Sequence, residues 1–366
     1  MRKINIIGSG FSSLSAACHL AKRGYQVEVF EKNSSLGGRA RQFQKDGFTF
    51  DMGPSWYWMP DVFERFFASF GKQVSDYYEL ERLNPGYQVV FGKDEVFPVH
   101  DSIEKIADRF ELEEKGSGRK LVYFLNQAKR NYDVAIEDLV YKPGVSPLEL
   151  ITPVTIKNAG LFLTNVRKQV ERDFKSPKLR SILQFPVLFL GAKPEQTPAF
   201  YNFMNYADFG LGTWHPKGGM IQIVNAMASL AKELGVCFYT DAAVDEIITN
   251  NKKATGIRVG DKIHEADIII SGADYHHTES LLQASLRGYS EAYWKKKVFA
   301  PSSLLFYMGI DKKLDNLAHH NLFFDVDFDQ HASSIYDTPE WPKEPLFYVN
   351  LPSISCRCCN RSFWGS

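Results

Sequence analysis

One stretch near the start of the chain, IIGSGFSSLSAACHLAKRGYQVEVFEK (6–32), constrains the fold more than any other. A short β-branched run, 3–7, is followed by Gly8, Gly10 and Ser13 in the spacing G-x-G-x-x-S. The first glycine permits a tight turn, the second lets the backbone approach a pyrophosphate, and the third position needs a small residue where helix and strand pack. Serine meets that demand nearly as well as alanine. The pattern predicts a strand, a turn and a helix whose free N–H groups face phosphates.

An acidic residue stands where such a unit needs one. The predicted helix ends at Gly24, a second strand follows over 26–30, and Glu31 closes it 18 residues after Ser13. A carboxylate at this place is typical of ribose recognition and favours a ribose without a 2′-phosphate. Because strands, helix and acid occur in this order, we expect a dinucleotide site rather than a purely structural glycine turn.

A second glycine turn distinguishes between two dinucleotides. Gly37-Gly38-Arg39 comes just after the acid, and Asp51-Met52-Gly53-Pro54 follows shortly beyond. Paired glycines admit close backbone approach, and an arginine can hold a phosphate with two parallel hydrogen bonds. A nicotinamide enzyme would continue into another strand–helix repeat, whereas flavin enzymes of the glutathione-reductase type have this second turn. The sequence therefore favours FAD, and here it resembles the superfamily of flavin amine oxidases and carotenoid desaturases.

The nucleotide-binding pattern is interrupted and resumes later. WHPKGGM (214–220) is another glycine-rich turn before a helix, and strands are expected at 236–240 and 266–274, with a hairpin between them turning at Asn250-Asn251. We therefore predict an α/β fold with a discontinuous, Rossmann-like FAD-binding domain. Its predicted ranges are 1–75 and 213–298, and those of an inserted α+β substrate domain are 76–212 and 299–353.

Within the insert, 87–99 alternates in hydropathy and predicts a hairpin. The ranges 103–110 and 120–139 predict helices, and 63–70 predicts one before the insert. The range 148–189 is expected to be mostly helical, with breaks at Pro153, Pro177 and Pro186.

The composition argues against several classes of protein but does not point to a particular function. Lys plus Arg equals Asp plus Glu, at 43 each, so nothing points to nucleic acid. No apolar run has the length of a bilayer span, and the polar, glycine-broken start is unlike a secretory signal. We therefore expect a reducing cytoplasm without disulfides, with Cys18 and Cys237 buried in the core. The adjacent pairs His276-His277 and His319-His320 point different ways on any regular element, so no shared metal is expected.

Several stretches together are similar to bacterial phytoene desaturases, from residue 4 to about Ser353. They are GFTFDMGPS, the turn 198–201, GTWHPKGGM, ISGADYHHT and SSLLFYMGIDKKLDNLAHHNLFF. The resemblance implies an FAD-dependent enzyme that removes hydrogen from a long linear polyene in carotenoid biosynthesis. It also implies FAD contacts from Gly8, Gly10, Ser12, Ser13, Glu31, Lys32, Gly37, Gly38, Arg39, Gly53, Pro54 and Val244. Val244, in the strand expected after Thr240, would meet the adenine through its backbone.

Phytoene is the default substrate that the resemblance implies, and a hydroxycarotenoid 3,4-desaturase or another carotene desaturase or isomerase is the alternative. An apolar substrate lives in lipid. The basic and apolar stretch 157–180 is therefore expected to dock on the cytoplasmic side of the inner membrane without spanning it, although a solvated helical face over a core is the plainer interpretation. No residue is assigned as catalytic acid or base, because Asp133 and Asp138 have the character of surface residues. The oligomeric state is left open.

The end of the chain departs from the resemblance. Family members continue with a further substrate section and a last FAD-binding segment, whereas the range 354–366 ends in CRCCNRSFWGS, without strand or helix period. A change of reading frame near Ser355 or premature truncation is the expectation, with a short natural tail as the alternative. Two competing hypotheses follow: another flavin oxidoreductase such as an amine oxidase, and a truncated, catalytically inactive member that binds no flavin.

Overall fold

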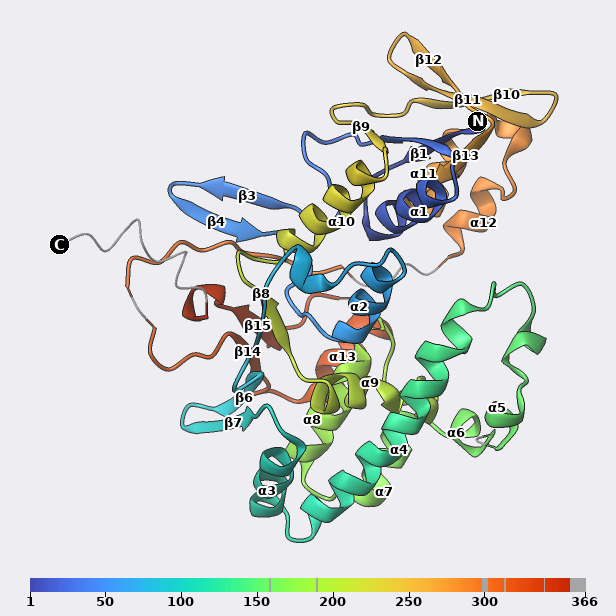
Figure 1. Ribbon diagram of the computed structural model, residues 1–366. Helices are drawn as coiled ribbons and strands as arrows, with labels where there is room; N and C mark the ends of the chain where they lie inside the picture. Colours follow the sequence, from blue (N-terminus) through green and yellow to red (C-terminus); the bar gives the residue numbers. More distant parts are fainter. Residues whose placement is uncertain (158, 189, 298–301, 313, 339, 356–366) are drawn as a thin grey trace.

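A computed structural model describes residues 1–355, except 158, 189, 298–301, 313 and 339. The predicted tail at 354–366 therefore falls almost entirely outside the described residues. Within the described part, no helix is both long and apolar enough to cross a bilayer. Figure 1 shows two assemblies of elements, one around a parallel sheet near the N-terminus and one around a second sheet with most of the helices.

A four-stranded parallel sheet carries the N-terminal motif. Its strands, in spatial order, are β13 (Ile268–Ser271), β1 (Lys3–Ile7), β2 (Gln26–Phe30) and β9 (Cys237–Tyr239). The helix α1 (Phe11–Lys22) joins β1 to β2 and ends where Gly24 takes φ +84°. Strands from two ranges far apart in the sequence, 3–30 and 237–271, thus share one sheet, as the predicted interruption requires. The domain boundaries themselves stay a prediction.

The core beside this sheet lies between α1 and α10 (Ile221–Glu233). Leu14 and Cys18 of α1 are fully buried against Val224 and Met227 of α10, and the Cys18 thiol reaches the Met227 carbonyl oxygen at 3.7 Å. The expected burial of Cys18 is confirmed. Burial raises the pKa of its thiol to about 12, so this cysteine stays a neutral core residue.

The expected burial of Cys237 is wrong. Its side chain is exposed, because β9 is the edge strand of the parallel sheet and Cys237 opens it. The strand predicted at 266–274 is also shorter and less buried than expected, since β13 forms the opposite edge and is half covered. Apolar neighbours in sequence cannot distinguish an edge strand from a central one.

An antiparallel meander covers one end of this sheet. Its strands are β10 (Glu246–Asn250), β11 (Lys253–Val259) and β12 (Lys262–Glu265). Ile247 and Ile257 pack with Ile7 and Phe30 of the parallel sheet. The predicted hairpin is present, but its turn lies one residue later than expected. Asn250 pairs with Lys253, so the loop is 251–252, where both residues take positive φ as a tight hairpin requires.

The second sheet is mixed. Its strands, in spatial order, are β15 (Phe347–Asn350), β14 (His320–Phe323), β6 (Tyr87–Gly92) and β7 (Glu95–Val99). The predicted hairpin at 87–99 is confirmed as β6–β7, and β14 runs parallel to β6. The remaining described strands form two small two-stranded sheets. They are β3 (Gln42–Lys45) with β4 (Phe48–Asp51), and β5 (Leu80–Arg82) with β8 (Trp214–Pro216).

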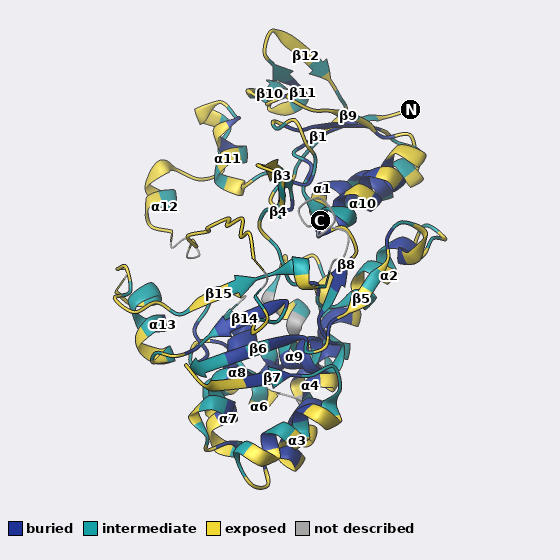
Figure 2. Cartoon of the chain, turned by 90° about the vertical axis from the view of Figure 1, so that its left-hand side faces the viewer, coloured by how far each residue is buried: buried dark blue, intermediate teal, exposed yellow. Residues whose placement is uncertain are grey.

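Helices cover the second sheet, and Figure 2 shows the dark buried positions gathered between them and the strands. Among these helices are α3 (Ile103–Glu113), α4 (Ser117–Glu137), α7 (Val166–Asp173) and α8 (Pro177–Leu188). The remaining helices are α2 (Pro60–Ala68), α5 (Pro153–Lys157), α6 (Ala159–Leu163), α9 (Phe203–Asn205), α11 (Tyr275–Ser280), α12 (Glu291–Lys295) and α13 (Phe328–Tyr336). Of these, α2 packs into the core beside the parallel sheet, and α11 and α12 lie next to that sheet (Figure 1).

The three prolines expected to break the helical region 148–189 do not act alike. Pro153 and Pro177 open α5 and α8, at the position where a missing N–H costs nothing. Pro186 does not break a helix, because it lies inside the last turn of α8, buried with Phe185 and Val187. Packing of this turn in the core outweighs the lost hydrogen bond.

Candidate functional site

The turn from β1 into α1 leaves an open space at the start of the helix. Gly8 takes φ +85°, and Gly10 caps α1 with an ordinary φ of −69°. A Cβ on Gly10 would meet no heavy atom within 4 Å. The first intrahelical bond runs from Leu14 N to Gly10 O at 2.9 Å, so the N–H groups of residues 11–13 have no acceptor within the helix. This end of α1 has no acidic residue, and it suits an anion.

Ser13, the third position of the motif, is a packing residue. It is buried, and a Cβ on Gly272 would lie 1.9 Å from its hydroxyl oxygen. The helix therefore packs so closely on the turn after β13 that neither Ser13 nor Gly272 could be replaced by a larger residue. Ser12, by contrast, is exposed beside the open space.

Glu31 is held by donors on both of its carboxylate oxygens. Ser9 donates its backbone N–H and its hydroxyl to Oε2, at 3.0 and 2.6 Å, and Asn33 donates its backbone N–H and side-chain amide to Oε1, at 3.0 and 2.5 Å. Burial by itself would raise the pKa of Glu31, but these hydrogen bonds outweigh it and lower the pKa. The side chain is only 3% exposed and stays charged at neutral pH. Lys32, next in sequence, is exposed.

The second glycine turn lies directly against the first. Gly37 donates to the Ser9 carbonyl at 3.1 Å, and a Cβ on Gly38 would lie 3.1 Å from the Cα of Gly10. Gly37 and Gly38 take φ +112° and +59°, conformations that side chains rarely adopt. Arg39 is exposed and makes no ion pair with any residue that the structure describes. Its guanidinium is therefore free to meet an anionic ligand.

The third predicted group, Gly53-Pro54, is positioned by Asp51, which opens the same motif but had no role predicted from sequence. Asp51 accepts the Met220 N–H at 2.7 Å and the Gln42 amide at 2.9 Å, which joins the end of β4 to the WHPKGGM turn. Gly53 takes φ +86° and is exposed, while Pro54 is half-buried. Spacing offered no signal for this role of Asp51, because Met220 lies 169 residues away.

Val244 lies near Glu31, although not in the strand that was expected. It belongs to an extended stretch that ends before β10 begins at Glu246. In the same stretch, Ala242 donates its N–H to the Glu31 carbonyl oxygen at 2.9 Å. The strand prediction for Val244 was wrong, because this stretch makes only isolated backbone bonds, from Ala242 to Glu31 and from Asp245 to Arg258 of β11, and no regular ladder. Except for Ser13, which packs beneath the turn, the predicted site residues therefore line the carboxyl ends of β1 and β2 and the loops beside them.

Three histidines form a buried cluster that sequence reasoning missed. His215 of β8 lies 4.5 Å from His319 between ring centroids, and His319 lies 4.4 Å from His320 of β14. His320 bonds the Tyr348 hydroxyl at 2.6 Å through Nδ1, and its ring stacks on Trp56 at 4.2 Å. Among the described atoms, both ring nitrogens of His215 and the Nε2 atoms of the other two histidines are buried without a partner.

Burial keeps these histidines neutral. It lowers the pKa of His215, that of His319 to about 3, and that of His320 well below its ordinary value. The Tyr348 hydroxyl also bonds the Ser55 hydroxyl at 2.9 Å, next to Pro54. A hydrogen-bonded route therefore leads from the Gly53-Pro54 turn to the cluster. Across residues 1–355 with their stated gaps, no group of metal-ligating side chains is arranged to hold a metal ion.

A buried acid lies deeper in the insert. Tyr87 donates its hydroxyl to Asp208 Oδ2 at 2.7 Å, and both side chains are shielded from solvent. Burial raises the pKa of Asp208 well above its ordinary value. The two acids of the insert weighed from sequence behave as surface residues, since Asp133 and Asp138 form ion pairs with Lys129 and Lys142 at the surface.

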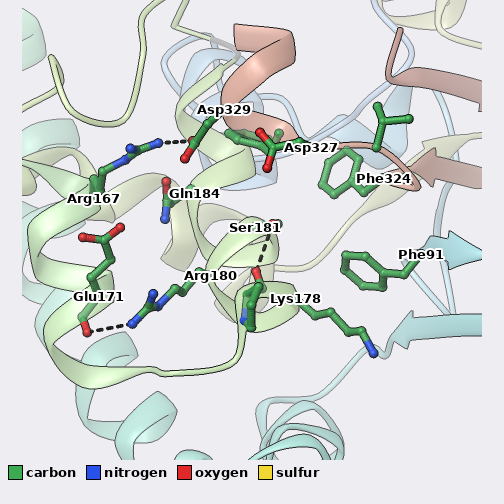
Figure 3. A pocket seen from close by; sticks show the side chains of 13 residues that line it. Phe91, Arg167, Glu171, Lys178, Arg180, Ser181, Gln184, Phe324, Asp327 and Asp329 are labelled. Atoms are coloured by element: carbon green, nitrogen blue, oxygen red, sulfur yellow. Dashed lines mark hydrogen bonds and ion pairs between the residues drawn. The ribbon is translucent and has the colours of Figure 1, made fainter. Parts of the chain in front are cut away.

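The hollow drawn in Figure 3 lies elsewhere, between α7, α8 and the start of α13. Arg167 is paired with Asp329 there, and the Arg180 guanidinium donates to the Glu171 carbonyl oxygen at 3.4 Å. None of the predicted site residues lines it. Arg167 and Asp329 are its one ion pair between lining side chains among the described residues, while Lys178 pairs with Glu95 outside the hollow.

Comparison with known proteins agrees with this geometry. A family model of flavin-containing amine oxidoreductases matches residues 11–340. A carotenoid 3,4-desaturase from Haloarcula japonica is 41% identical over 96% of this chain and 72% of its own length. A zeta-carotene-forming phytoene desaturase from Myxococcus xanthus is 32% identical over 96% of this chain and 68% of its own length.

Solved structures share the fold at lower identity. An oxidoreductase from Methanosarcina mazei aligns with a TM-score of 0.53 at 21% identity, over 80% of this chain. This chain spans 64% of the length of that structure. The α/β fold with a Rossmann-like sheet is therefore confirmed, and the family implies FAD as cofactor. The chain belongs to the flavin-containing amine oxidoreductase family, among the carotenoid desaturases.

Proposed function

We propose that this chain is built for the FAD-dependent desaturation of a linear carotenoid. The observation that carries the proposal is 41% identity to a carotenoid 3,4-desaturase over 96% of the chain. The glycine turns support it, because the open space at Gly10 and the charged Glu31 fit the ADP half of FAD.

The N–H groups at the start of α1, including that of Ser12, would hold the pyrophosphate, and Gly10 would let it approach. Arg39 would reach the same phosphates, with Gly38 packed beneath. Each oxygen of Glu31 already accepts two hydrogen bonds, so a ribose hydroxyl would take the place of a side-chain donor from Asn33 or Ser9. We place the backbone of Val244 beside the adenine and Lys32 at the rim of the ribose site.

When bound, FAD would accept a hydride from one carbon of a saturated CH–CH unit of the polyene, while the adjacent carbon loses a proton to solvent or a base and the double bond forms. The protein would orient that bond and exclude water. We place the Gly53-Pro54 turn towards the flavin half, because it follows β4 and is tied to the WHPKGGM turn through Asp51. The aromatic and neutral histidine side chains beyond it, Trp56 and His320, would give this region a largely apolar character.

Two substrates are open to this architecture. The higher identity to a carotenoid 3,4-desaturase supports 3,4-desaturation of a hydroxylated carotenoid. Phytoene, the default from sequence, is the second candidate, supported by the 32% identity to a phytoene desaturase.

We also propose peripheral docking on a lipid surface, through a stretch that lies mainly before 157–180 and overlaps it only at 157–163. In that range, Val166, Val170 and Phe174 are buried, and Arg167 and Lys178 are engaged in ion pairs. Exposed apolar side chains gather instead in the docking stretch 140–163, before and within α5 and α6. They are Val140, Tyr141, Val145, Leu148, Ile151, Ile156 and Leu163, each at least 59% exposed.

The test is turnover in vesicles. The purified protein, saturated with FAD, receives either phytoene or a hydroxylated carotenoid in lipid vesicles, and the longer conjugated product is followed by its red-shifted absorption. We expect product from one of the two substrates. An FAD-loaded protein that converts neither would contradict the proposal, and a protein that fails to retain FAD at saturating concentration would favour an inactive family member.

A further inference from the structure

The segment SSLLFYMGI, residues 302–310, is an apolar stretch that the fold leaves uncovered. Six of its large side chains are between 39% and 74% exposed: Leu304, Leu305, Phe306, Tyr307, Met308 and Ile310. Successive side chains of an extended chain point to opposite sides, and both sets are exposed here. A continuous apolar run of this length is typical of a strand that is buried on both faces.

The backbone of this segment is uncovered as well. None of its N–H or C=O groups forms a hydrogen bond with a residue that the structure describes. Figure 1 shows it as an extended trace beside the β3–β4 hairpin. Its ring contacts are with that hairpin, where Tyr307 lies 4.9 Å from Phe43 and 5.6 Å from Phe50 between ring centroids. Extended backbone with free donors and acceptors is a ready template for strand pairing.

We infer that 302–310 is the docking edge for a β-strand from a further polypeptide segment, one equivalent to the part of the carotenoid desaturases that this chain does not match. The relatives are long enough to contain such a segment, because this chain covers only 72% and 68% of their lengths while 96% of this chain is matched.

Two other occupants fit the surface less well. A lipid surface would cover the apolar side chains but would leave the N–H and C=O groups unpaired, which is costly in a bilayer. A second copy of this chain would offer only the same uncovered segment, and edge-to-edge pairing would leave the apolar side chains on both faces of the paired strands exposed. A strand from a segment that has its own sheet partners would pair with the backbone of 302–310, and the rest of that segment would cover the apolar side chains.

A strand docked on 302–310 would also affect the proposed FAD site, because the β3–β4 hairpin connects the two. Tyr307 packs on Phe43 and Phe50, and β4 leads from Phe50 through Asp51 to Gly53. A strand that fixes 302–310 would therefore also fix the turn that we place towards the flavin half. The inference itself does not depend on the substrate, and complex formation can be measured without flavin.

The probe is the part of the Haloarcula japonica desaturase that lies outside its match with this chain. It is made once as a separate polypeptide and once linked to the full 366-residue chain. We expect a one-to-one complex by size exclusion with light scattering. We also expect slowed amide exchange at 302–310 in the complex and in the linked protein, compared with the free chain.

Two variants target the edge. The double change Phe306→Lys with Met308→Lys puts charges on one face, and Leu305→Pro removes a backbone donor. Each is expected to weaken binding of the separate probe at least tenfold. The matched control, Val145→Lys with Leu163→Lys, alters equally exposed apolar residues in the docking stretch and should bind the probe like the parent.

Any one of the following results would overturn the inference. One is rapid amide exchange at 302–310 in the linked protein, where the local concentration of the probe is highest. The second is slow exchange of the same segment in the free monomer. The third is equal loss of binding in the control, or self-association through 302–310 in place of a complex with the probe.

Discussion

Ser9 places both its backbone N–H and its hydroxyl on one carboxylate oxygen of Glu31, at 3.0 and 2.6 Å. The first glycine turn is thereby tied to the end of β2 before any ligand is bound. Asn33 completes the set on the other oxygen. The acid that we assign to the ribose is therefore also a structural residue, and its two roles can be separated by experiment.

Replacing Glu31 by Gln puts an amide donor against donors from Ser9 and Asn33. We expect the unfolding free energy of the flavin-free protein to fall by about 1–3 kcal/mol, and FAD affinity to fall further, since the ribose loses its charged acceptor. Urea unfolding and flavin fluorescence titration measure the two effects. The control is Glu246→Gln on β10, which removes only a half-exposed pair with Arg258. A loss confined to stability would show that Glu31 has no part in binding.

Gly10→Ala separates the ligand space from the fold. Because φ is −69° and the new Cβ meets nothing within 4 Å, the unfolding free energy should change by less than about 0.5 kcal/mol. The methyl group would occupy the space that we assign to the pyrophosphate, so FAD binding should weaken at least tenfold. Gly8→Ala, at φ +85°, should instead cost about 1–2 kcal/mol of stability. Unchanged FAD affinity in Gly10→Ala would place the phosphates elsewhere.

The histidine cluster should make stability depend on pH. In the unfolded chain His319 takes up a proton as the pH falls below about 6.5, whereas the lowered pKa of about 3 keeps the folded side chain neutral. The unfolded state then binds more protons, so stability falls as the pH falls between these values, by up to about 1.4 kcal/mol per pH unit.

His319→Asn should flatten this dependence between pH 4.5 and 7, because it removes one titrating group while an amide can still bond Ser355. Urea midpoints at several pH values measure the slope. His277→Asn, at an exposed position, is the control and should keep the parent slope. If the slope of His319→Asn equals that of the parent, other buried groups govern the acid sensitivity.

Asp208 makes stability depend on pH in the opposite direction to the histidines. Burial raises its pKa in the folded state, so the stability it contributes is present at low pH and is lost as the pH rises through the folded pKa. Asp208→Asn keeps an acceptor for Tyr87 without a charge, so it should match or exceed the parent stability at pH 8. Asp208→Ala leaves the Tyr87 hydroxyl unpaired and should cost about 1–3 kcal/mol. Thermal unfolding at pH 5 and 8 compares the three proteins.

The docking stretch 140–163 can be tested against the stretch 157–180 that the sequence favoured. Val145→Glu, Leu148→Glu and Ile151→Glu together should lower binding to lipid vesicles at least tenfold, since each residue is at least 59% exposed and free to enter lipid. Vesicle flotation measures this binding. Leu112→Glu, at another exposed leucine, is the control.

The comparison variant for that test changes Lys168 and Lys175 to Glu, because both lysines are exposed in 157–180. We expect only a small effect that added salt abolishes. A large loss in this variant, with none in the glutamate triple variant, would return the membrane contact to the basic stretch.

Local pattern was enough for the first glycine turn and for the hairpin at 87–99. Gly8, Gly10 and the alternation of 87–99 report backbone geometry within a few residues, and such geometry is encoded nearby in the sequence. Boundaries were less certain, as the turn at 251–252 shows. There, one residue of register decided which residues form the loop, and cross-strand pairing set that register.

The sequence by itself determined the βαβ unit, its acid at Glu31 and the family, because these depend on short spacings. Only the tertiary structure brought Asp51 to Met220 and Asp208 to Tyr87, which lie 169 and 121 residues apart. It also gathered three histidines and left 302–310 uncovered, although that segment has the composition of a buried strand. Burial and pairing depend on what the rest of the chain places alongside, and no local pattern records that.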